Sequence, residues 1–321
     1  MKKSNFLKID YSTFSSYLGR SATVLVFSAI ILLAFGALFF GHEDMAHMPI
    51  SIGVCAFDSA RASSALESLA DFVREKGGGD IRWNYFGFSK EPSGCDFYLM
   101  TSLQASPFIS RGELDCSLIA TVREGLRYSR GAVIVRPGTA GRQIASGKLI
   151  FSSAVSATGF LSPYLALKEA GPGFCPNPGD IDFAGHYQDD ARVIFGVLFG
   201  AYQAGGIDLE RFRFLEKRGV IREGELDVLF EGAPLPEVLM ANDRSVDSKK
   251  VKGFTCRLPA ILERMPHSLK ANLAELGIAG FAAVRQEDLI LLERFPSIVP
   301  KELSDHISLF NRTTADSLGE K

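Results

Sequence analysis

The chain has 321 residues, of which 46% are hydrophobic and 22% are charged, and its formal net charge at pH 7 is −2. This balance provides enough apolar material for a globular body of one or two lobes and excludes disorder as its main state. Without residues 1–41, which hold four basic residues and one acid, 31 basic and 36 acidic residues remain, a net charge of −5. An acidic body disfavours nucleic acid, and we expect no nucleic-acid partner.

The N-terminal segment differs in character from the rest of the chain. Residues 1–20 are basic, and residues 21–41 form an uncharged run whose central 19 residues, 22–40, are almost wholly apolar. A helix of this length crosses the hydrocarbon core of a membrane. The basic residues before it, and Glu43 and Asp44 after it, place the N-terminus in the cytoplasm and the body outside. We therefore predict a cytoplasmic segment over residues 1–20 and a single transmembrane anchor over residues 21–41.

A cleaved signal peptide is the alternative interpretation of this segment. The apolar run is longer than a usual signal core, and it ends in Leu-Phe-Phe-Gly at residues 38–41 with no small-x-small cleavage site. These features favour retention of the helix. The expected location is the inner membrane, single-pass, with the globular domain in the periplasm or outside the cell.

The five cysteines are an odd number for a protein in an oxidising compartment. At least one therefore stays unpaired or pairs between chains. Their spacings match no zinc or redox motif, and we predict no metal and no cofactor. Cys55 and Cys95 fall in or just before expected core strands, where small buried hydrophobes are the default interpretation. A disulfide between these two remains an alternative.

Strand and helix patterns alternate at the start of the body. Residues 50–57 are expected to form a strand, residues 59–76 a helix that ends at a Gly-Gly-Gly-Asp stop, and residues 81–88 and 97–101 the next strands. This order predicts an α/β fold with a mainly parallel, doubly wound sheet. Because ligands of such sheets bind at the carboxyl ends of strands, Thr101 becomes a candidate wall of the site.

A turn rich in hydroxyl groups is the most informative local pattern. Residues 148–151 are typical of a buried strand, Ser-Ala-Thr-Gly follows at 156–159, and residues 160–171 are typical of a helix with a glycine stop. The free N–H groups and the positive end of such a helix attract an oxyanion, and the hydroxyls of Ser156 and Thr158 add donors. Ordinary helix capping is the alternative.

The order of segments around this turn resembles that of the substrate-binding components of phosphate, phosphite and phosphonate ABC importers. In that family a strand ending in Val-Arg precedes Gly-Lys, a Ser-Thr-Ser-Gly turn, a helix ending Glu-Ala-Gly, a His that opens the next helix, and Gly-x-x-Asp-Ala-Gly. The corresponding segments here are residues 133–136, 147–148, 156–159, 168–171, 185–186 and 200–205, with Tyr-Ser before them at 128–129 and Ala-Pro-Leu-Pro after them at 233–236. The resemblance covers roughly residues 50–266.

The resemblance implies a two-lobed type II periplasmic-binding-protein fold, with two doubly wound sheets and a hinge, over residues 50–310. Lobe I would comprise about residues 50–136 and 233–310, and lobe II about residues 137–232, with a polar tail at 311–321. It also implies these ligand-binding residues: Ser156, Ala157, Thr158 and Gly159 in the turn, His186 at the next helix, Tyr128 and Thr101 from lobe I, and Gln203.

Two departures from the family pattern affect the ligand. Ala157 replaces the middle Thr of the turn, which removes one hydroxyl donor. Gln203 replaces an acidic residue that could pair with a cationic group, so a simple oxyanion is favoured over an aminoalkylphosphonate. Loss of tight ligand binding, leaving a degenerate clamp, is a further alternative.

The remaining acidic residues do not form an enzyme site by their spacing. Asp189, Asp190, Asp208 and Glu210 are interpreted as helix-start charges and a solvated turn. No nucleophile is followed by a base and an orienting acid, and no nucleotide loop or metal motif is present. We therefore predict no catalytic residues and no enzymatic activity.

Together these patterns predict a membrane-anchored extracytoplasmic solute-binding protein for a phosphorus oxyanion. Clamp closure on the ligand would be recognised by a membrane permease with its ATPase. The alternative is a sensor or interaction protein that uses the same clamp with a membrane signalling partner and transports nothing.

Overall fold

The computed structural model describes residues 49–57, 59–86, 92–122, 125–139, 141–185 and 189–299, and only the backbone of residues 59–61. The predicted anchor at 21–41 and the polar tail at 311–321 lie outside these residues. Among the helices that are described, none has the length and apolar character to span a membrane.

The first lobe is built on a six-stranded sheet. Its strands are β1 (Ile50–Val54), β2 (Ile81–Tyr85), β3 (Phe97–Thr101), β4 (Leu114–Thr121), β10 (Val238–Asp243) and β11 (Gly280–Ala283). Their order is β11-β4-β10-β3-β1-β2, with β1 parallel to β2 and β3, and β10 antiparallel to both of its neighbours. Strands are thus present within the expected ranges 50–57, 81–88 and 97–101, although β1 ends at Val54 and β2 at Tyr85. The late strand β10 occupies a central position.

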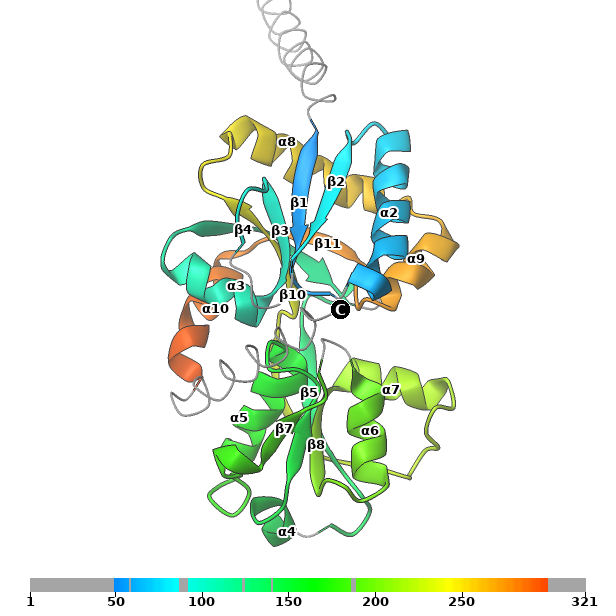
Figure 1. Cartoon of the computed structure of the whole chain (residues 1–321), viewed down its shortest axis with the longest axis vertical. Helices are drawn as coiled ribbons and strands as arrows, with labels where there is room; N and C mark the ends of the chain where they lie inside the picture. Colours follow the sequence, from blue (N-terminus) through cyan, green and yellow to red (C-terminus); the bar gives the residue numbers. More distant parts are fainter. Residues whose placement is uncertain are drawn as a thin grey trace, which may run out of the picture. The chain divides into compact units, whose positions relative to one another are not determined.

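Helices cover both faces of this sheet (Figure 1). They are α2 (Ser59–Glu75), α3 (Ser102–Ser110), α8 (Ser248–Leu262), α9 (His267–Ala274) and α10 (Gln286–Ile298). Leu66, Leu69 and Val73 recur at helical spacing along α2, and they are buried in one core cluster with residues of β1, α8 and α9. Helices α3 and α10 pack against each other and contribute to a second cluster on the opposite face.

The second lobe is built on a five-stranded sheet. Its strands are β5 (Ser129–Val135), β6 (Leu149–Phe151), β7 (Ile181–Phe183), β8 (Ala204–Asp208) and β9 (Asp227–Leu235). Their order is β7-β6-β8-β5-β9, with β6 parallel to β7 and β8, and β5 antiparallel to β8 and β9.

Short helices surround the second sheet. They are α4 (Gly141–Ala145), the π-helix η2 (Ala157–Leu161), α5 (Ser162–Glu169), the 3₁₀ helix η3 (Pro178–Asp180), α6 (Asp190–Leu198) and α7 (Leu209–Lys217). Helix α5 contacts β9 and β5, and its buried residues join the second core cluster, which continues into the first lobe. Apolar residues of α6 and α7 form a third cluster against the opposite face.

The pairing of β5 places the first crossover earlier than the sequence analysis expected. The resemblance implies that residues 133–136 end lobe I, whereas β5 pairs with β8 and β9 of the second sheet. The chain therefore crosses between β4 and β5, and it returns between β9 and β10. Gly131 explains why β5 fits there, because a Cβ at this position would lie 2.4 Å from the carbonyl oxygen of Thr158. Only a glycine allows η2 to approach the strand so closely.

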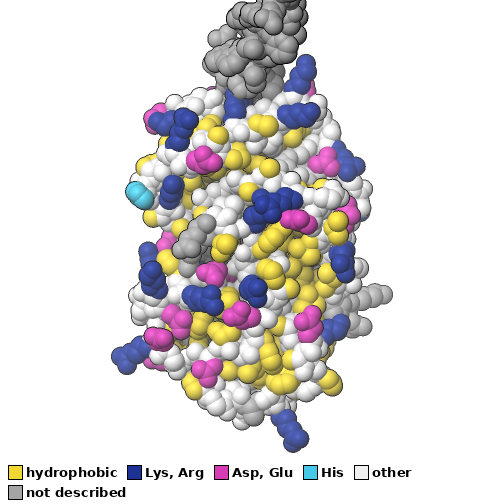
Figure 2. Space-filling model, turned by 180° about the vertical axis from the view of Figure 1, so that it is seen from behind, with side chains coloured by type: hydrophobic (Ala, Val, Ile, Leu, Met, Phe, Trp, Pro, Cys, Tyr) yellow, Lys and Arg dark blue, Asp and Glu magenta, His cyan; other side chains and the backbone are white. Residues whose placement is uncertain are grey.

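The face shown in Figure 2 carries basic and acidic side chains interspersed over both lobes, with apolar side chains between them. No large basic area is visible on this face.

Candidate functional site

The hydroxyl-rich turn connects β6 to a continuous helical run over residues 157–169. Ser156 has an extended backbone conformation and is the N-cap, and its Oγ accepts the backbone N–H of Gly159 at 2.7 Å. The first turn is a π-helix, which passes directly into α5. The predicted helix start near Ser156 is thus observed, and it places Ser156 and Thr158 at a buried helix N-terminus.

Gly159 is essential to the shape of this turn. A Cβ at this position would lie 1.8 Å from Oγ of Ser152 and 2.9 Å from Oγ of Ser156. Ser152 follows β6 directly and is buried. The glycine therefore lets two hydroxyl-bearing side chains pack against the helix backbone.

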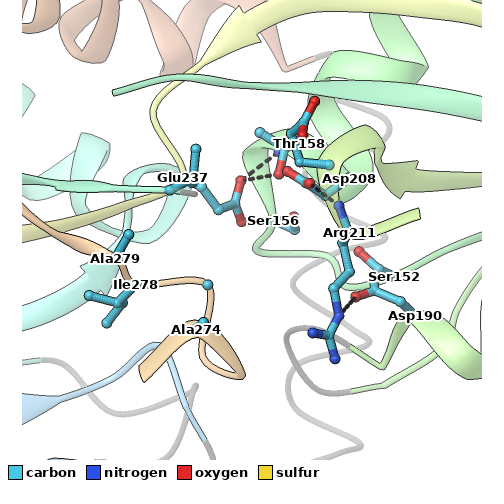
Figure 3. A pocket seen from close by; sticks show the side chains of 13 residues that line it. Ser152, Ser156, Thr158, Asp190, Asp208, Arg211, Glu237, Ala274, Ile278 and Ala279 are labelled. Carbon is cyan, nitrogen blue, oxygen red and sulfur yellow. Dashed lines mark hydrogen bonds and ion pairs between the residues drawn. The ribbon is translucent and has the colours of Figure 1, made fainter. Parts of the chain in front are cut away.

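The hydroxyl and N–H donors of the turn converge on one carboxylate, that of Glu237 (Figure 3). Ser156 Oγ donates to Oε1 of Glu237 at 2.8 Å. The backbone N–H of Thr158 and its Oγ1 hydroxyl both donate to Oε2, at 2.6 and 2.7 Å. We call these three donors the anion cradle. The cradle holds an oxyanion group, as the sequence predicted for such a turn, but the group belongs to the protein itself.

Glu237 lies at the second crossover between the lobes. It stands between β9 of the second sheet and β10 of the first, directly after Pro236. Its backbone is fixed to the first lobe, because Ser102 donates its N–H to the carbonyl of Glu237 at 2.8 Å and its hydroxyl to the carbonyl of Pro236 at 2.6 Å. The Glu237 side chain then reaches across to the anion cradle of the second lobe.

Burial changes the acidity of Glu237. Only 4% of this residue is exposed. Desolvation raises the pKa of its carboxyl, the hydrogen bonds from Thr158 and Ser156 lower it, and the nearby Asp208 raises it again, giving a pKa of about 7. Burial likewise raises the pKa of Asp208. Glu237 therefore changes its charge near neutral pH.

A cavity adjoins the anion cradle, with about 560 Å³ of empty space including a part open to solvent. The second lobe contributes most of its charged lining, and Glu237 comes from the crossover between β9 and β10. The first lobe contributes small or apolar residues that follow β4, end α9 or precede β11. The lining residues are Val122, Ser152, Ser156, Thr158, Asp190, Asp208, Glu210, Arg211, Glu237, Ala274, Gly277, Ile278 and Ala279.

Arg211 supplies the basic group of this lining. Its side chain is 13% exposed, and its guanidinium lies 3.4 Å from a carboxylate oxygen of Asp190 and 3.6 Å from one of Glu275. Asp208 caps the same helix by accepting the backbone N–H of Arg211 at 2.8 Å. Asp190 and Asp208 are thus helix-start residues as predicted, but they face a cavity rather than a solvated turn (Figure 3).

The other residues that the sequence analysis proposed for the site lie elsewhere. Thr101 caps α3 in a capping box with Gln104, and Tyr128 donates its hydroxyl to Asp288 of α10. Gln203 accepts a hydrogen bond from Arg136 at 3.2 Å. It precedes β8, whereas the cavity adjoins Asp208 at the other end of that strand. Their hydroxyl and amide groups therefore have partners outside the cradle.

Ala157 is fully buried in the turn, where it contributes backbone only. His186 lies outside the described residues, and its predicted contact with a ligand stays a prediction. Within the described part of the chain, no group of three His, Cys, Asp or Glu side chains could hold a metal ion. The five cysteines, all of them described, are free thiols in this structure.

Sequence reasoning missed Glu237, Ser152 and Arg211. Glu237 follows the Ala-Pro-Leu-Pro segment that marked the return to lobe I, so its position in the hinge was available. The signal for Glu237 in the sequence is an acidic residue at a crossover next to a predicted anion site. Arg211 was one of several charged residues on α7, and the sequence alone did not distinguish it.

Two α/β lobes joined by two crossovers, with a cavity beside them, form a periplasmic-binding-protein-like fold of the solute-binding class. A family model described as "ABC transporter, phosphonate, periplasmic substrate-binding protein" matches residues 95–289, which is more than half of the chain. The chain therefore belongs to this family, whose members bind solutes rather than catalyse reactions. The resemblance inferred from the order of segments is confirmed.

Solved structures support the fold at low sequence identity. The chloride-bound protein XAC2383 from Xanthomonas citri aligns with a TM-score of 0.57 and 16% identity, covering 84% of this chain and 99% of that one. A binding-protein component of an ABC phosphonate transporter from Pseudomonas aeruginosa gives 0.57 and 13%, covering 84% and 96%. PhnD1 from Prochlorococcus marinus, in complex with methylphosphonate, gives 0.55 and 13%, covering 78% and 97%. No curated protein sequence matches the chain.

Proposed function

We propose that the protein is a membrane-anchored extracytoplasmic solute-binding protein for a phosphorus oxyanion, namely phosphate, phosphite or a phosphonate. Residues 21–41 would anchor it in the inner membrane. A permease with its ATPase would take the ligand from the closed clamp. The family of the chain supports the solute-binding and transport role.

One observation carries the proposal: three donors converge on a carboxylate at 2.6 to 2.8 Å at a buried helix N-terminus. These are the lengths of hydrogen bonds to a charged oxygen acceptor. A carboxylate and a phosphonate both offer ionised oxygens, so Glu237 stands in for the group that such donors would bind in a ligand. Ser156 and Thr158 would contact the oxyanion, and His186 would add a donor from the next helix.

A second candidate is a sensor or interaction protein that uses the clamp without transport. The observation that favours it is the same carboxylate, because a residue of the protein itself, Glu237, accepts the hydrogen bonds of the anion cradle. A permanent anchor at residues 21–41 would also suit a protein that signals to a membrane partner rather than shuttling a solute.

The test is thermal unfolding of the full-length protein in detergent, with phosphate, phosphite, methylphosphonate, 2-aminoethylphosphonate or sulfate at millimolar excess. A ligand at about 100 times its dissociation constant should stabilise the fold by about 2.7 kcal/mol. Ser156→Ala should abolish the shift, and Ser146→Ala, at an exposed position just after α4, should leave it intact. No shift with any anion would favour the second candidate.

A further inference from the structure

All three donor hydrogen atoms of the anion cradle form hydrogen bonds to Glu237. Thr158 gives both its N–H and its hydroxyl hydrogen to Oε2, and Ser156 gives its hydroxyl hydrogen to Oε1. A Ser or Thr hydroxyl has one hydrogen to donate. An oxyanion therefore cannot receive the same three hydrogen bonds while the carboxylate stays in place.

The charges around Glu237 also disfavour the presence of Glu237 and a bound oxyanion at the anion cradle at the same time. Asp208, Glu210 and Asp190 are acidic lining residues from β8, α7 and α6, and Arg211 of α7 is ion-paired with Asp190 and Glu275. The first-lobe residues that line the cavity carry no side-chain charge, and they are Val122 after β4, Ala274 of α9, and Gly277, Ile278 and Ala279 before β11. A bound anion beside ionised Glu237 would thus add like charge next to a buried carboxylate.

We propose that Glu237 is a built-in competitor for the ligand, so that an oxyanion occupies the anion cradle only when the Glu237 carboxylate leaves it or becomes neutral. This inference rests on the proposed function, since it concerns the same site. It assigns to a hinge residue the role of setting the affinity for the ligand. A protein with Glu237 should bind oxyanions more weakly than the same protein without this acid.

The position of Asp208 beside Glu237 explains how the Glu237 carboxyl can become neutral. The Thr158 hydroxyl lies within hydrogen-bonding reach of both Asp208 and Glu237, and it can donate to only one of them at a time. A proton shared by the two acids neutralises one of them, and the neutral acid no longer competes for the Thr158 hydroxyl. With a pKa of about 7 for Glu237, roughly one molecule in ten carries the neutral carboxyl at pH 8. The apparent affinity then falls by about tenfold.

Isothermal titration of the full-length protein in detergent tests the inference. Sulfate and methylphosphonate would be titrated into the wild type, Glu237→Gln and Glu237→Ala at pH 6 and pH 8. Sulfate keeps its charge over this range, so its binding isolates the titration of the protein. Glu169→Gln, an exposed acid at the end of α5, is the matched control.

At pH 8 both Glu237 variants should bind about tenfold more tightly than the wild type, and the difference should shrink at pH 6. The control should match the wild type at both pH values. Equal affinities of the wild type and both variants at both pH values would overturn the competitor role while leaving the proposed function intact. Binding by none of the proteins would overturn the proposed function.

A measurement without ligand keeps the inference testable in that last case. In the wild type the backbone N–H of Thr158 donates to Glu237, so its hydrogen exchange should speed up in Glu237→Ala. Exchange at the same rate in both proteins would show that the carboxylate does not occupy the cradle. The competitor role would then be wrong whatever the anions do.

Discussion

One oxygen atom of Glu237 accepts both the backbone N–H and the side-chain hydroxyl of Thr158, at 2.6 and 2.7 Å, although the two residues lie 79 positions apart in the chain. Thr158 belongs to the helix start of the second lobe, and Glu237 to the crossover that leads into the first. The free N–H groups of a helix start are usually satisfied by the helix's own cap or by water. Here a residue of the hinge satisfies one of them.

The stability of the protein should depend on pH through Glu237. The folded-state pKa of about 7 lies above the ordinary value of 4.5. Between these values the folded state binds more protons than the unfolded state, so the free energy of unfolding should fall as pH rises from 4.5 to 7. The loss should total about 3 kcal/mol. Urea unfolding at a series of pH values measures it.

Glu237→Gln should flatten most of this slope, and Glu169→Gln should preserve it. The raised pKa of Asp208 adds a slope of the same sign, so the Glu237 variant should keep a smaller decline. The same pH dependence in Glu237→Gln and in the wild type would show that Glu237 is already ionised across the range.

Gly159→Ala should distort the anion cradle. The added Cβ would lie 1.8 Å from Ser152 Oγ, which forces the turn or the serine to move. Overpacking of this kind should lower the free energy of unfolding by about 1 to 3 kcal/mol. Gly173→Ala is the control, because a Cβ there meets no atom within 4 Å. Chemical denaturation of both variants gives the comparison, and equal midpoints would mean that Ser152 moves away freely.

Tyr128→Phe should weaken the fold without changing oxyanion binding. The Tyr128 hydroxyl donates to Asp288, which is fully buried and also accepts from Arg127 at 2.7 Å. Loss of a hydrogen bond to a buried carboxylate should cost about 1.5 to 3 kcal/mol. Tyr202→Phe, which removes a hydrogen bond to the exposed part of Asp182, should cost less. Reduced anion binding with unchanged stability would instead restore Tyr128 as a ligand contact.

Cys256 should be the fastest-reacting thiol of the native protein, because it is exposed whereas Cys116 and Cys175 are partly buried and Cys55 and Cys95 are buried. Cys256 on α8 is exposed, whereas Cys55 is buried and desolvation raises its pKa to about 12. Since the thiolate is the reactive form, Cys55 should be inert at pH 8. Titration with a disulfide reagent should therefore give a fast phase that Cys256→Ser removes and Cys55→Ser retains. A fast phase that survives Cys256→Ser would contradict this assignment.

The parts of the site that depend on local sequence were predictable. Ser156 and Gly159 lie within four residues of each other, and a hydroxyl before a helix with a glycine in its first turn is recognisable from the sequence. Helix α2 and the strand at residues 97–101 were likewise predicted from their sequence patterns. Short-range capping and periodic burial determine these features.

The parts that depend on which strands pair were not predictable. Tyr128 was assigned to the ligand from lobe I, but β5 joins the second sheet and directs the preceding residue to α10. The family motif predicts Gln203 at the ligand, but this residue lies at the opposite end of β8 from the cavity. Glu237 reaches the cradle only because β10 is inserted between β3 and β4, a long-range arrangement that no local pattern encodes.

The hydrogen bonds from Ser102 to Pro236 and Glu237 determine which sheet the Glu237 backbone moves with. Both carbonyls of this crossover are held by Ser102 at the start of α3, so the Glu237 backbone moves with the first sheet, while the helix start at Ser156 moves with the second. Rotation of one sheet against the other must then stretch or close the contact between carboxylate and hydroxyl. The angle between the two sheets and the distance from the Glu237 carboxylate to the helix start should therefore change together, and a distance probe across this contact would report the rotation.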